Sequence, residues 1–140
     1  MGLAASQARF LSLTARKSNV EYQGQQVNQS RTSLAEQSAS LFNDMVNLKP
    51  PTPPDANLYP GGFESDAYKE AFAQYEIDKA NYEYQYARIN ARTEALQEED
   101  RQLELKLKQL DTEQEAIQTE MEAVKKVIDK NIEATFKTFA

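Results

Sequence analysis

Apolar residues recur every seven positions along most of the second half of the chain. The series is Tyr68, Tyr75, Tyr82, Ile89, Leu96, Leu103, Leu110, Ile117 and Val124, and it ends at Asn131. A seven-residue period keeps one stripe on one side of a helix wound at about 3.5 residues per turn, and such a stripe faces other helices. The pattern therefore predicts a long helix that packs along its length.

The first part of the chain carries a second series with the same period. Its members are Leu13, Val20, Val27, Leu34, Leu41 and Leu48. The companion seam positions are Phe10, Lys17, Gly24, Arg31, Ser38 and Met45, which are apolar only at the two ends. This polar middle weakens a simple two-stranded zipper. Glycine inside a helix costs about 1 kcal/mol relative to alanine, so we interpret Gly24 as a bend or a close helix contact.

All five prolines lie between residues 50 and 60 and are followed by Gly61 and Gly62. Proline cannot continue a helix and favours extended backbone before it. The sequence thus predicts an N-terminal helical arm over residues 1–49, a Pro/Gly-rich connector over 50–64 and a long C-terminal coiled-coil helix over 65–140. The predicted fold class is all-α, an elongated helical hairpin or coiled-coil bundle.

The two arms differ in length. At 1.5 Å per residue the second helix would extend about 108 Å and the first about 69 Å. A simple hairpin would leave part of the second arm unpaired. The companion positions of the long ladder are most polar from Thr93 to Asp100. We therefore expect either a break near residues 93–100, which gives three helices, or a partner from another molecule for the excess.

Two stretches admit a second interpretation. The tyrosines of residues 81–86 alternate as in a strand, but helix formers flank them, so we expect helix, with Tyr84 off the seam and pointing outward. After Ile117 the apolar spacing changes to an eleven-residue pattern, and the tail holds Lys125, Lys126, Lys130 and Lys137 beside Phe136 and Phe139. We interpret this tail as the last packed turns; contact with a membrane surface is the alternative.

Composition narrows the chemistry. The chain has no histidine, no cysteine and no tryptophan. It therefore lacks the side chains most used for proton transfer near neutral pH, for thiolate attack and for zinc binding, and we expect no enzyme, no cofactor and no metal. Residues 1–49 carry five basic and three acidic side chains, a net charge of +2, so the remainder of the −6 chain carries −8. Opposite charges favour pairing of the arms, and nothing resembles the basic stripe that nucleic acid requires.

Targeting signals are equally sparse. The sequence has no run of about 18 apolar residues that would span a membrane, and its start lacks the basic and apolar regions of a signal peptide. We expect a cytoplasmic protein or one exported without a cleaved signal. The start also matches the N-myristoylation pattern Met-Gly-x-x-x-Ser, with Ser6 in the last place. A helix that begins with small residues is the other explanation of this sequence.

The segments Ala4–Lys17 and Leu110–Ile128 resemble the termini of small uncharacterised bacterial helical proteins. The succession of helix, proline-containing turn and second helix, without cysteine, is similar to the needle and axial proteins of type III and flagellar export systems. The resemblance implies a bacterial protein whose terminal helices pack against those of other copies.

The function predicted from these features is structural. We expect a non-enzymatic protein that self-assembles through its terminal helices into a homo-oligomer or polymer, as an exported filament or sheath subunit. The predicted packing and assembly residues are Leu13, Val20, Val27, Leu34, Leu41, Leu48, Leu103, Leu107, Leu110, Ile117, Met121, Val124 and Ile128. The alternative is a soluble coiled-coil adaptor or chaperone that clamps a partner helix between its arms. Membrane-surface binding through the tail ranks third.

Overall fold

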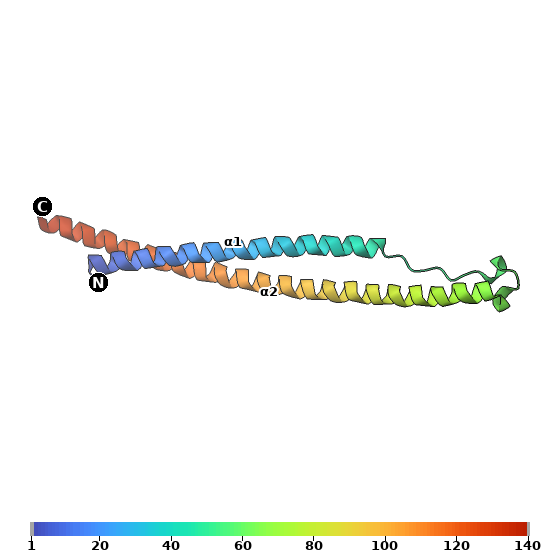
Figure 1. The fold of residues 1–140 in the computed structure, drawn as a ribbon. Helices are drawn as coiled ribbons and strands as arrows, with labels where there is room; N and C mark the ends of the chain where they lie inside the picture. The colour runs from blue at the N-terminus through green and yellow to red at the C-terminus, as the bar shows by residue number, and fades with distance from the viewer. Residues whose placement is uncertain (1, 140) are drawn as a thin grey trace. The chain divides into compact units, whose positions relative to one another are not determined.

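A computed structural model describes the backbone of residues 2–139 and the side chains of residues 2–138. Two long helices, α1 (Leu3–Asn47) and α2 (Asp66–Phe139), are joined by a connector that contains the short 3-10 helices η1 (Ala56–Leu58) and η2 (Gly62–Glu64) (Figure 1). No β-strand occurs in this part of the chain. The molecule is an all-α helical hairpin, which confirms the predicted fold class.

Helix α2 is unbroken where a break was predicted. It runs through residues 93–100 in one α-helix (Figure 1), because Asp66–Phe139 contains neither glycine nor proline. The polar seam positions are also satisfied. Thr93 Oγ1 donates a hydrogen bond to the Ile89 carbonyl at 2.8 Å, and Asp100 accepts hydrogen bonds from Arg31. The three-helix prediction was therefore wrong, since polar side chains alone do not interrupt a helix whose backbone bonds remain intact.

The connector ends in a turn that packs on the first turns of α2. Gly61 and Gly62 have φ angles of +92° and +59°, a left-handed conformation that favours glycine. Beyond them, the Tyr68 ring of α2 meets Tyr59 edge-on at 5.8 Å and Phe63 edge-on at 5.3 Å between ring centroids. Tyr68, the first residue of the seven-residue series, thus packs on the connector. The prediction of an unpaired stretch in the second arm did not include this partner.

The hairpin contains two compact units, and each pairs part of α1 with part of α2. The terminal unit joins α1 up to Ser33 to α2 from Asp100 onward. Its buried core consists of Leu13, Val20, Val27, Leu110, Ile117 and Val124, flanked by the partly buried Phe10, Leu103, Leu107, Met121 and Ile128. Leucine, isoleucine and valine at seven-residue spacing thus form one apolar seam between the helices of this unit.

The connector unit comprises Leu34–Glu99 and includes the connector. Leu34, Ile89 and Leu96 are its buried apolar residues. Across its two helices, Arg92 Nη2 donates a hydrogen bond to Gln37 Oε1 at 2.8 Å. Leu41 and Ile89 line a shallow hollow on this unit together with polar residues. The connector unit is thus packed more openly than the terminal unit.

Gly24 makes no close contact, contrary to one interpretation of the sequence. A Cβ atom added there would meet no heavy atom within 4 Å.

We expect Gly24→Ala to raise the free energy of unfolding by about 0.5–1 kcal/mol, because alanine restricts the unfolded chain and favours helix. Urea unfolding followed by circular dichroism measures the change. The matched variant Gly61→Ala should lower stability, since φ is +92° at that position. Loss of stability in Gly24→Ala would show that the position is crowded.

Candidate interaction surfaces

The helices of the terminal unit run antiparallel, and two ion pairs mark their register. Arg31 pairs with Asp100, and Arg9 pairs with Glu120 at 3.7 Å. Counting in opposite directions along the two helices from these pairs gives registers that differ by two residues, and their mean places Leu13 level with Ile117 and Val20 level with Leu110. Every apolar rung of one helix therefore meets a rung of the other, which explains why these positions are 1–3% exposed.

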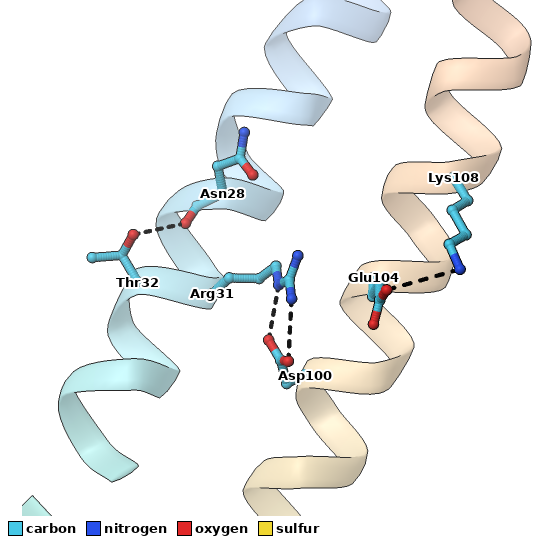
Figure 2. Close-up of polar contacts among 6 residues, drawn as sticks. All are labelled: Asn28, Arg31, Thr32, Asp100, Glu104 and Lys108. Carbon is cyan, nitrogen blue, oxygen red and sulfur yellow. Dashed lines mark hydrogen bonds and ion pairs between the residues drawn. The ribbon is translucent and has the colours of Figure 1, made fainter. Parts of the chain in front are cut away.

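The Arg31–Asp100 pair lies within the seam itself (Figure 2). Arg31 Nε donates to Asp100 Oδ1 at 2.8 Å, and Nη2 donates to Oδ2 at 3.2 Å. This two-pronged geometry makes the pair directional. The hydrogen bonds from Arg31 hold the pKa of Asp100 below its ordinary value, and the same bonds raise the pKa of Arg31. Because both side chains are more than one-third exposed, we assign the pair to register more than to stability.

On the outer sides of both helices near this pair, the polar contacts that Figure 2 draws lie within one helix. Thr32 Oγ1 donates to the Asn28 carbonyl at 3.0 Å. On α2, Lys108 and Glu104 form an ion pair at 3.8 Å at i, i+4 spacing. Such contacts within one helix add little to tertiary packing. The Arg31–Asp100 pair is thus the polar link between the two helices in this view.

The thirteen predicted packing residues all lie at least partly buried. Seven are buried, namely Leu13, Val20, Val27, Leu34, Leu110, Ile117 and Val124. Six are half-buried, namely Leu41, Leu48, Leu103, Leu107, Met121 and Ile128. The buried seven are covered within the hairpin, so a second molecule reaches only the edges of the half-buried six. A role of these residues in contacts between copies stays a prediction.

Ser6 is a seam residue that the sequence analysis passed over. It lies seven positions before Leu13 and is 0% exposed, and its hydroxyl is buried without a hydrogen-bond partner in the described part of the chain. The period of seven points to this position, but serine is not apolar. The serine of the myristoylation pattern is thus a packed seam residue in this structure.

Both helices also carry a second stripe of small and apolar residues on the side away from the seam. Its members are spaced alternately by four and three. The α1 outer stripe consists of Ala4, Ala8, Leu11, Ala15, Ser18 and Tyr22, and the α2 outer stripe consists of Ala73, Ile77, Ala80, Tyr84, Ala87 and Ala91. All twelve are exposed, including Leu11 at 69% and Tyr84 at 66%. Among these twelve residues only Tyr84 was predicted to point outward, because alanine is a strong helix former and is common on any helix surface.

The end of α2 adds a smaller apolar patch. Ile132 and Phe136 are 51% and 74% exposed, and they line a mainly apolar hollow with Leu3 and Thr135. The side chain of Phe139, which the membrane alternative also involves, lies outside the described residues. Lys137 forms an ion pair with Glu133 at 3.2 Å. This pairing offsets one of the basic charges that would face a membrane.

Within residues 2–139, no group of acidic side chains is arranged to hold a metal ion. Neither of the described helices has an apolar stretch sufficient to cross a membrane. The surfaces of residues 2–138 include the outer stripes, the patch at the end of α2, the shallow hollow of the connector unit and a hollow lined by Gln7, Phe10, Leu11, Lys125, Ile128 and Asp129. No protein-family model matches the chain, and no curated protein or solved structure matches it either.

Proposed function

We propose that this chain is a non-enzymatic structural protein that self-assembles into a homo-oligomer or polymer, as an exported filament or sheath subunit. The observation that supports it most is the pair of outer stripes. Each helix has one apolar face used within the hairpin and a second face, with helical spacing, that is exposed. A second packing face on a helix suits contact with a further helix.

The exposed area supports the same proposal. The chain exposes 10450 Å² at a mass of 15.9 kDa, whereas a compact monomer of this mass exposes about 7,300 Å². Only nine of the described apolar side chains are buried. One seam between two helices is a thin core for a chain of this length, and contacts with other copies would add the burial that it lacks.

The test is the mass of the purified protein as a function of concentration, measured by light scattering and sedimentation, with negative-stain microscopy of the product. We expect particles heavier than 15.9 kDa that grow with concentration into ordered polymers. A strictly monomeric species at high concentration would contradict self-assembly. Leu110→Lys is unsuitable as a test of assembly. Leu110 is 3% exposed, so a charged side chain in its place would unfold the hairpin.

A soluble adaptor or chaperone is the second candidate. The hollow of the connector unit favours it, since the half-buried Leu41 and Leu48 there leave apolar surface beside Asp44 and Arg92. A partner helix with apolar residues at i and i+4 would fit such a surface. This function predicts a stable monomer whose Leu48→Asp variant keeps its fold. Polymers of the purified wild-type protein would contradict the adaptor or chaperone function.

A further inference from the structure

The two outer stripes have the same spacing. Both step by 4, 3, 4, 3 and 4 residues, so a stretch of one can be laid along the other in parallel with a constant offset of 69 positions. In that alignment each bulky residue lies level with a small one. Leu11 is level with Ala80, Tyr22 with Ala91, Ile77 with Ala8 and Tyr84 with Ala15. Alternation of large and small residues lets two helix faces interdigitate.

The charges of the two stretches are opposite. Residues 3–22 of α1 hold three basic side chains and one acidic side chain, a net charge of +2, and the residues of α2 that lie level with them, 72–91, hold two basic and three acidic side chains, a net charge of −1. An antiparallel pairing of either stripe with itself also sets large residues against small ones. That pairing brings like charges together, whereas the pairing of α1 with α2 brings opposite charges together.

We propose that the α1 outer stripe of one copy packs on the α2 outer stripe of a second copy. This inference rests on the proposed self-assembly and names the surfaces that carry it. The contact joins two different patches, so it is heterologous. Of two joined copies, one keeps a free α2 outer stripe and the other a free α1 outer stripe, so addition continues until a ring closes or a filament grows. Every copy in the interior of the assembly contacts two neighbours.

Two variants test this pairing, each with one stripe removed. Leu11→Glu places a carboxylate in the α1 outer stripe, and Tyr84→Glu places a carboxylate in the α2 outer stripe, so the two disrupted stripes repel each other in a mixture. Both positions are exposed, so circular dichroism should show the wild-type helix content. We expect each variant alone to sediment as a monomer of about 15.9 kDa. An equimolar mixture should form a heterodimer, because the intact α2 outer stripe of the Leu11 variant pairs with the intact α1 outer stripe of the Tyr84 variant. Assembly should stop there, since no second intact stripe remains on either molecule.

The matched control is Phe42→Glu, which is 68% exposed on α1 and lies at a heptad position that belongs to neither stripe. It should assemble like the wild type. Dimers of either variant alone would overturn the pairing in favour of a stripe that binds itself. A mixture that stays monomeric, or single variants that assemble as fully as the wild type, would also overturn it and leave self-assembly standing. A monomeric wild type would contradict the proposed function together with this pairing.

Discussion

Replacing Ile117 by alanine is expected to lower the free energy of unfolding by about 2–5 kcal/mol. Ile117 is 1% exposed and belongs to the core of the terminal unit with Leu13 and Leu110. The substitution removes buried methyl groups and leaves a cavity that two stiff helices cannot fill by collapse. Because single domains are stable by only about 5–15 kcal/mol, the loss is a large share of the total. Urea unfolding at fixed protein concentration, followed by circular dichroism, measures it.

Leu105→Ala is the control for this experiment, in the same helix and the same unit. Leu105 is 43% exposed, so its truncation should change stability by less than about 1 kcal/mol. Equal effects of the two substitutions would mean that Ile117 is not buried between the helices. Both variants gain alanine, which has high helix propensity. The difference between their free energies of unfolding therefore measures the contribution of the buried seam.

Proline in place of Gln97 is expected to destabilise the chain by about 3 kcal/mol or more. Gln97 is exposed and lies inside the stretch where the sequence suggested a break, within the continuous helix α2. Proline removes the backbone hydrogen bond to the carbonyl of Thr93 and clashes with that carbonyl. We expect a lower helix content and a lower midpoint of urea unfolding.

Gln97→Ala keeps the backbone bond and should be neutral or slightly stabilising. If the proline variant matched the alanine variant in both readouts, the helix would already be interrupted near this residue. Both substitutions leave the buried seam unchanged, because position 97 faces solvent. The pair therefore tests the continuity of α2 with every seam residue retained.

The sequence allowed the seam to be predicted because burial follows directly from the period. Leu110, Ile117 and Val124 step by seven and are 1–3% exposed. It did not allow the continuity of α2 to be predicted, because the periodicity of one helix does not show which polar residues meet across the hairpin. Asp100 is unfavourable in a seam taken alone, but the guanidinium of Arg31, 69 residues earlier, supplies its partner.

Two further features required the structure. Tyr68 belongs to the ladder, yet its ring packs on Tyr59 and Phe63 of the connector as well as on Phe72 of α2. The alanines of the outer stripes carry an ambiguous signal, since alanine serves both helix formation and close packing. Only the exposure of Leu11, Ile77 and Tyr84 distinguishes these stripes as apolar surface.

The register of the terminal unit constrains how related sequences can change in length. Deletion of one residue between Val20 and Val27 would rotate every later rung of α1 by about 100° away from α2. Removal of seven residues from α1 alone would restore the rotation but would shift the Arg31–Asp100 pair by two turns. Insertions and deletions should therefore occur as whole heptads in both helices at once. The connector is exempt from this rule, and length variation among homologues should concentrate there.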